Sequence, residues 1–314
     1  MIVVLTGGTG GAKFVQGLQK IAAPKEVTYI VNTGDDLRWW GLHVSPDVDS
    51  ILYALAGKLS RERGWGVEGD TFHCLETMRQ LGQPAWFQLG DRDLATHLLR
   101  TRLLSQGFTL AEATAEIAQR LGIESRVLVM SNERVETRVQ TASGELSFQE
   151  YFVRERYAVE ARGVRFDGTE QAKPAPGVVE GIMKAEQIII APSNPVTSIG
   201  PILAVPGIRR ALQQTAATIA AISPIIGDGA VSGPAAALMK TQGWPVSIAG
   251  VAHAYRDFLD VLICDVRDAG RKHDVEQLGI AVRCTQTLMR SDADKQELAR
   301  FALEAMQNTA VAAS

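Results

Sequence analysis

The stretch that decides the fold reads Ile2-Val3-Val4-Leu5-Thr6-Gly7-Gly8-Thr9-Gly10-Gly11-Ala12-Lys13. Its first part, Ile2–Leu5, is wholly apolar, as expected of a strand covered on both faces. Glycines then interrupt the run, and apolar residues return at helical spacing. Pro24 ends this helix, and Val27–Val31 is a second apolar strand. A strand, a helix and a strand in this order predict a parallel sheet.

The same alternation returns late in the chain. Apolar runs, each ending in a polar or glycine-rich turn, predict further strands at Gln187–Ala191, Thr218–Ser223, Val246–Val251, Val261–Cys264 and Ile280–Cys284. The middle differs, with helical periodicity over about 50–125 and alternating polar and apolar residues over about 126–166. We therefore predict one Rossmann-like, doubly wound α/β domain over residues 1–314. A helical insertion and an antiparallel β-ribbon interrupt its mainly parallel sheet.

Composition excludes several classes of protein. The 314 residues are 46% hydrophobic and carry a net charge of −3, without the basic excess usual for duplex binding. Three widely spaced cysteines argue against a disulfide framework or a cysteine zinc site. The N-terminus lacks signal-peptide features, and no stretch is apolar enough to cross a bilayer. We expect a cytoplasmic protein with small-molecule substrates and neither nucleic-acid nor membrane partners.

The glycine-rich turn has the features of a phosphate-binding loop. Glycines have no side chain to exclude a phosphate, and the helix that follows presents free N–H groups. The spacing matches neither a Walker A loop nor the complete dinucleotide fingerprint. The candidate phosphate-binding residues here are Gly8, Thr9, Gly10, Gly11 and Lys13. The alternative is a merely tight strand-to-helix turn, which four glycines in five residues disfavour.

An acidic loop follows the second predicted strand. It contains Asp35 and Asp36, and Asp47 and Asp49 come shortly afterwards. One acidic residue here could bind a ribose, as in a dehydrogenase. Four carboxylates near phosphates instead favour a cation, and Mg²⁺ suits this ligand set. The alternative role for Asp47 or Asp49 is to cap a helix over Ser50–Ala56.

Other polar loops supply further candidates. Arg92 could clamp a phosphate or a flat ring, or form a surface ion pair. Ser193, Asn194, Thr197 and Ser198 follow a predicted central strand, at the sheet edge where such folds bind ligands. Four aromatic residues could line an aromatic ligand or the core: Trp39, Trp40, Trp86 and Phe87. His97 stands alone and is expected to be structural. No nucleophilic triad emerges, so the chemistry fits positioning and electrostatic stabilisation, as in phosphoryl transfer.

Six blocks together resemble the 2-phospho-L-lactate (phosphoenolpyruvate) transferase family of coenzyme F-420 biosynthesis. They are Thr6–Lys13, Asn32–Asp36, Val44–Ser50, Gly90–His97, Ser193–Leu203 and Ser223–Pro234. The resemblance runs over about residues 1–270. It implies a Mg²⁺-dependent transferase, often homodimeric. Such an enzyme moves a phospholactyl or phosphoenolpyruvyl phosphate from a guanosine diphosphate-type donor to the ribityl hydroxyl of the deazaflavin Fo, releasing GMP.

The resemblance also implies roles for particular residues. Asp49 and Arg92 would contact Fo, and Asp36 and Asp47 would hold the metal. Asp49 and Lys13 would take part in catalysis. Gly227-Asp228-Gly229 departs from the family pattern, which has two glycines before a small residue. Two other functions compete: a non-catalytic nucleotide-sugar regulator of the related gluconeogenesis-factor branch, and an NAD-dependent dehydrogenase.

Overall fold

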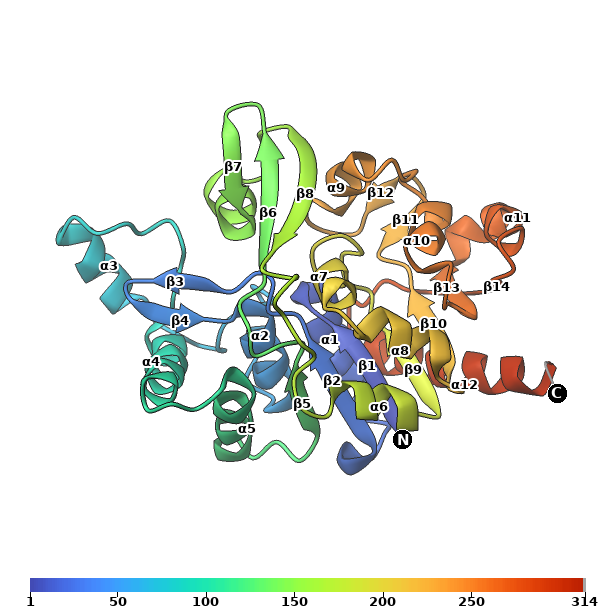
Figure 1. Cartoon of the computed structure of the whole chain (residues 1–314), viewed down its shortest axis with the longest axis horizontal. Coiled ribbons are helices and arrows are strands. Elements are labelled where there is room, and N and C mark those ends of the chain that lie inside the picture. Colours follow the sequence, from blue (N-terminus) through green and yellow to red (C-terminus); the bar gives the residue numbers. More distant parts are fainter. Residues whose placement is uncertain (313–314) are drawn as a thin grey trace.

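The computed structural model describes the backbone of residues 1–312 and the side chains of residues 1–307. Its centre is a parallel sheet of seven described strands in the order β14-β13-β10-β9-β1-β2-β5 (Figure 1). The strands are β1 (Ile2–Thr6), β2 (Val27–Val31), β5 (Arg126–Val129), β9 (Gln187–Ile190), β10 (Thr218–Ile222), β13 (Val261–Asp265) and β14 (Ala281–Thr285). Helices flank the sheet, so the predicted Rossmann-like fold class is confirmed.

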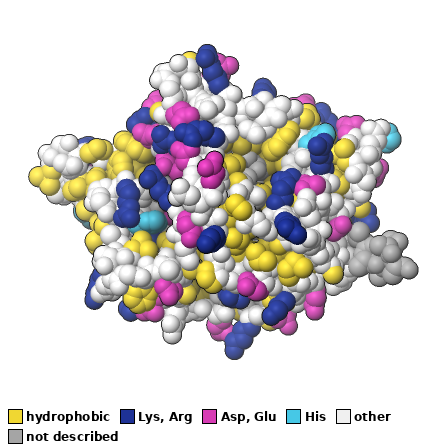
Figure 2. All heavy atoms as spheres, in the orientation of Figure 1, with side chains coloured by type: hydrophobic (Ala, Val, Ile, Leu, Met, Phe, Trp, Pro, Cys, Tyr) yellow, Lys and Arg dark blue, Asp and Glu magenta, His cyan; other side chains and the backbone are white. Residues whose placement is uncertain are grey.

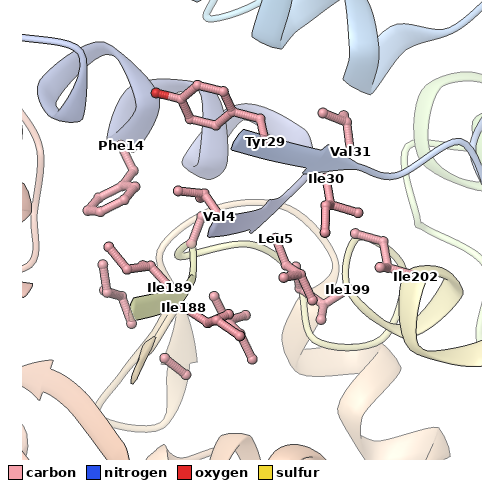
Figure 3. Close-up of a cluster of buried hydrophobic side chains, with 14 of the residues drawn as sticks. Val4, Leu5, Phe14, Tyr29, Ile30, Val31, Ile188, Ile189, Ile199 and Ile202 are labelled. Carbon is pink, nitrogen blue, oxygen red and sulfur yellow. The ribbon is translucent and has the colours of Figure 1, made fainter. Parts of the chain in front are cut away.

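The central strands are apolar along their whole length because both faces of the sheet are covered. Val4 and Leu5 are fully buried and point to opposite faces, as successive strand residues must. Figure 3 shows Val4 on the side of Phe14, and Leu5 on the side of Ile199 and Ile202. Leu5 and Val4 pair in register with Ile30 and Tyr29 of β2. The opening strand therefore forms part of the core on both of its faces.

Helices cover the sheet and follow its strands. They are α1 (Gly8–Leu18), α2 (Pro46–Leu55), α6 (Val178–Lys184), α7 (Gly200–Ala204), α8 (Ile208–Gln214), α9 (Ala235–Thr241), α10 (Ile248–Tyr255), α11 (Lys272–Glu276) and α12 (Asp292–Ala312). Helix α1 packs closely on α12 at Gly17, where any side chain would meet the backbone of Lys295. In the described residues no helix is long and apolar enough to span a membrane.

Two additions extend from the sheet in Figure 1. Between β2 and β5 lie the hairpin β3 (Leu37–Trp39) and β4 (Leu42–Val44), then α3 (His73–Gln80), α4 (Asp91–Ser105) and α5 (Leu110–Arg120). After β5 comes an antiparallel ribbon in the order β7-β6-β8, formed by β6 (Glu136–Thr141), β7 (Gly144–Ser147) and β8 (Ala161–Asp167). A π-helical turn, η2 (Glu150–Arg154), joins β7 to β8.

The structure corrects two boundaries. Arg126–Val129 was expected in the ribbon, but it forms β5 and pairs in parallel with β2, so the ribbon starts at Glu136. Val246–Val251 was expected to be a strand, and that prediction is wrong because α10 begins at Ile248. A short apolar run has no periodicity that separates a buried helix from a buried strand.

The face in Figure 2 mixes basic and acidic side chains, with no continuous basic region.

Gly10 tests the close packing of the glycine turn. A β-carbon at Gly10 would fall on the carbonyl oxygen of Pro192. Replacing Gly10 with alanine should therefore lower the free energy of unfolding by roughly 1–3 kcal/mol, as overpacking does. Gly181→Ala is the matched control, because Gly181 lies in helix α6 with no atom near its added methyl. Urea unfolding should show the control unchanged or stabilised. Equal stability of the two variants would contradict the packing argument.

Candidate functional site

A cavity of about 660 Å³ opens at the carboxyl ends of the central strands. The turns after β1, β2, β9, β10 and β14 all contribute to its wall. Open parallel sheets bind ligands at this edge, where loops from different strands converge. The candidate residues that line the cavity are Gly8, Thr9, Gly10, Lys13, Asp35, Asp47, Asp49, Ser193, Asn194, Thr197 and Ser198.

The glycine turn forms one side of the cavity. Helix α1 begins at Gly8, with no acidic residue in its first turn and no side-chain cap on its N-terminus. The backbone of Gly8 bonds to the Asp47 carboxylate, and the next N–H groups of the first turn are available to an anion. Lys13 also lines the cavity, and within residues 1–307 its ammonium makes no hydrogen bond or ion pair. Gly11 does not line the cavity; it packs against Thr6 and Ser193.

The loop after β9 lies against this turn. The hydroxyl of Ser193 donates to the Gly7 carbonyl at 2.7 Å. Asn194 instead shapes its own loop, since its amide oxygen accepts the N–H of Val196 at 2.9 Å. The buried hydroxyl of Thr197 has no partner among the described residues. The structure thus brings the two predicted halves of the donor site together.

Asp35 and Asp47 meet at the cavity wall. Both accept from the side-chain amide of Asn32, at 3.1 Å and 2.9 Å. Burial, together with the neighbouring Asp47, raises the pKa of Asp35 well above its usual range. Burial raises the pKa of Asp47 to about 6. Such a pair is stabilised in its ionised form by a nearby cation.

Asp36 faces away from the cavity. Its carboxylate accepts from Ser45 at 2.6 Å and lies 2.8 Å from the imidazole of His43, and it is not among the lining residues. One buried oxygen of Asp35 and one of Asp36 have no hydrogen-bond partner in the described part of the chain. Of the predicted metal ligands, Asp47 lines the cavity together with Asp35, whereas Asp36 does not. No group of three or more potential metal-binding side chains occurs in the described residues. Mg²⁺ needs fewer, because waters and phosphates complete its shell.

Asp49 is held from behind by a buried guanidinium. Both of its oxygens accept from Arg100, one of them at 3.1 Å, and Arg100 has no exposed surface. Helix α2 begins at Pro46, earlier than the expected Ser50, and its N-terminus has no side-chain cap. The helix-cap alternative for Asp47 and Asp49 is therefore wrong.

His97 is part of this buried cluster. Its ring lies between two carboxylates, with Nδ1 3.4 Å from Asp49 and Nε2 3.3 Å from Asp93. The hydroxyl of Tyr53 donates to Asp93 at 2.7 Å. Asp49, Asp93, His97 and Tyr53 all line the cavity. The histidine expected to be structural is thus also at the site.

Arg92 lies outside the cavity. It is exposed near the start of α4, where its backbone N–H donates to Asp70 at 2.8 Å. Its guanidinium reaches only the carbonyl of Glu68, at 3.4 Å. Sequence reasoning therefore missed Arg100, the arginine that touches Asp49. Arg100 occurs in mid-helix with no motif around it, and only its pairing partner reveals it.

Aromatic side chains line the rest of the cavity. Trp86 and Phe87 contribute from the α3–α4 connection, and Phe148 and Phe152 from the segment after β7. Trp39 packs behind Trp86, with ring centroids 4.7 Å apart, and does not line the cavity. The cavity wall therefore combines aromatic side chains with the glycine turn and the acidic loop.

The loop that departs from the family pattern also turns away from the site. Asp228 is exposed and pairs with Arg271 at 2.7 Å. The N–H of Gly227 donates to Asp268. The cavity is instead lined by the residues that follow, Val231 to Ala235. The departure therefore changes contacts outside the cavity.

Comparison with known proteins gives a consistent family. The model of the family described as 2-phospho-L-lactate transferase CofD matches residues 2–309. The chain is 41% identical to 2-phospho-L-lactate transferase of Methanosarcina mazei, over 97% of this chain and 100% of that protein. It is 44% identical to phosphoenolpyruvate transferase of Streptomyces griseus, over 96% and 97% of the two chains. A crystal structure of a UPF0052 family member from Bacillus halodurans has the same fold, with 20% identity, a TM-score of 0.68, and coverage of 96% and 98%.

The Asp49–Arg100 pair can be tested by removing one charge. Replacing Arg100 with methionine leaves Asp49 buried without its partner, which should lower the free energy of unfolding by about 3–5 kcal/mol. Adding Asp49→Asn should recover part of that loss. Arg102→Met, an exposed change on the same helix, should alter stability by less than about 0.5 kcal/mol. Urea unfolding of the wild type, Arg100→Met, Asp49→Asn, the double variant and Arg102→Met would refute the pairing if the losses of the first two single variants simply add in the double variant.

Proposed function

The chain belongs to the 2-phospho-L-lactate transferase CofD family, and on that premise we propose the reaction that it performs. It is a transferase of coenzyme F-420 biosynthesis. It moves a phospholactyl- or phosphoenolpyruvyl-bearing phosphate from a guanosine diphosphate-type donor to the ribityl hydroxyl of Fo. The observation that supports this proposal is one cavity whose wall contains both the glycine turn with Lys13 and several aromatic side chains.

The donor would lie at the glycine turn. Free N–H groups at the start of α1 and the unpaired Lys13 suit the phosphates. Thr197 and Ser198 line the same region and supply hydroxyl groups for the phosphates or the nucleoside. The positive end of helix α1 would also stabilise the charge that develops on the leaving phosphate.

The acceptor would lie against the aromatic side chains of the cavity. Trp86, Phe87, Phe148 and Phe152 offer flat apolar surfaces for a deazaflavin ring. Its ribityl chain would then extend toward Asp49. Arg100 already binds both oxygens of Asp49, which fixes the carboxylate at the cavity wall. We assign Asp49 the role of orienting the reacting hydroxyl through a remaining lone pair.

The reaction exchanges one phosphorus–oxygen bond for another. The acceptor hydroxyl attacks the phosphorus that carries the three-carbon acid, and the bond from that phosphorus to the bridging oxygen breaks. GMP leaves with the bridging oxygen and its electron pair. The hydroxyl proton passes to Asp49 or to solvent. Lys13 would neutralise the growing negative charge on the departing phosphate.

The carboxylate pair provides a fitting site for a divalent cation. Asp35 and Asp47 would hold Mg²⁺, since they are adjacent and buried, and one Asp35 oxygen has no partner among the described residues. When bound, the ion would supply Lewis-acid stabilisation of phosphate charge. Asn32 keeps the two carboxylates in place through its amide.

Turnover provides the direct test. Purified protein with Mg²⁺, Fo and a guanosine donor should release GMP, and the two donor types should be compared in parallel. The relatives carry both names, phospholactate and phosphoenolpyruvate transferase. The better donor, judged by kcat/KM, identifies the three-carbon acid. Fo that neither binds in fluorescence titration nor triggers GMP release with either donor would refute the proposal.

The cation site can be tested separately. Asp47→Asn removes one negative charge from the pair and should weaken Mg²⁺ binding about 10-fold or more, measured by calorimetry with the donor present. Asp36→Asn is the neighbouring control and should weaken binding much less, because Asp36 faces His43 and Ser45. If Asp36→Asn has the larger effect, the assignment of Asp35 and Asp47 is wrong.

A further inference from the structure

Arg156 is an arginine of the cavity wall whose side chain has no partner among the described residues. Arg156 lines the cavity, yet within residues 1–307 its guanidinium makes no hydrogen bond, ion pair or ring contact. Neighbouring Arg154 is different, since it pairs with Glu150 and Glu155 and lies over the ring of Trp86. A guanidinium presents five donors in a flat fork. Arg156 is thus an unused donor group facing a ligand cavity.

The backbone that presents Arg156 is strained. Arg156 and Tyr157 have φ values of 50° and 45°, in the left-handed region that side chains with a β-carbon disfavour. These two residues come shortly after the π-helical turn η2, separated from it by Glu155. Strain of this kind persists only where the surroundings enforce it, and it concentrates at functional sites. π-Helical turns also concentrate there.

Specific contacts enforce this conformation. The ring of Tyr157 stacks on Phe152, with centroids 6.0 Å apart, and Phe152 stacks on Phe148 at 5.5 Å. The N–H of Tyr157 donates to the carbonyl of Tyr151 at 2.8 Å. The segment is also tied to the acidic loop, because the Gln149 amide donates to the Asp35 carbonyl at 3.3 Å. These contacts of neighbouring residues hold the backbone of Arg156 beside Phe148 and Phe152.

We propose that Arg156 is a specificity residue that binds the polar edge of the acceptor ring. This inference rests on the proposed function, which places the deazaflavin against Phe148 and Phe152. A flavin-type ring carries carbonyl oxygens and ring nitrogens along one edge, and these accept hydrogen bonds from a guanidinium. Lys13 also lines the cavity, and the proposed function assigns it to the donor's phosphates. The aromatic wall binds the ring's faces, and Arg156 selects its edge.

Substitutions at Arg156 separate this role from a structural one. Fluorescence titration should give at least a fivefold higher Kd for Fo with Arg156→Ala and Arg156→Gly, and a smaller rise with Arg156→Lys. The donor KM should change by less than twofold. Glycine tolerates the left-handed backbone, so the Tm of Arg156→Gly should equal or exceed that of the wild type. Arg162→Ala, an exposed change on β8 outside the cavity, is the matched control.

Each outcome supports or overturns the inference. Unchanged Fo affinity in a folded Arg156→Gly protein overturns it and leaves the proposed function intact. A rise confined to the donor KM also overturns it, because Arg156 would then bind the donor's carboxylate or phosphate. A wild-type protein that does not bind Fo overturns this inference together with the proposed function.

Discussion

The structure depends on a close approach that only glycine permits. A β-carbon at Gly7 would fall on the Asp47 carboxylate, one at Gly10 on the Pro192 carbonyl, and one at Gly11 on the Thr6 and Ser193 hydroxyls. The start of helix α2 and the loop after β9 thus both meet the glycine turn. Because no side chain intervenes, the start of α1 reaches the cavity together with the acidic residues. The proposed donor and cation sites are therefore adjacent.

The second constraint is the concentration of buried charge. Asp35 and Asp47 sit together without a basic partner, so burial raises the pKa of both. The environment of Asp49 differs from that of this pair, since Arg100 binds both of its oxygens. The same acidic region thus contains two kinds of carboxylate. Asp35 and Asp47 have no basic partner among the described residues, whereas the charge of Asp49 is already balanced by Arg100.

Local patterns predicted most of the fold and the two loops that are proposed to bind the donor. The apolar strands, the glycine turn and the Ser193–Ser198 loop are each contiguous in sequence, and a parallel sheet brings its strand ends to one edge. The errors arose where the pattern was ambiguous or the partner distant. Val246–Val251 is too short for its period to be read, and Arg126–Val129 could be assigned to the sheet only through its pairing with β2.

The sequence by itself determined the fold class, the position of the glycine turn after the first strand and the family, because these depend on residues close together along the chain. Only the tertiary structure decided which side chains share the cavity. It placed Asp35, His97 and Arg156 on the cavity wall, left Asp36 and Arg92 off it, and put Arg100 behind Asp49. Those choices depend on the direction in which a side chain points after helices and loops have packed. Spacing along a chain does not contain that direction when the partner is 51 residues away, as Arg100 is from Asp49.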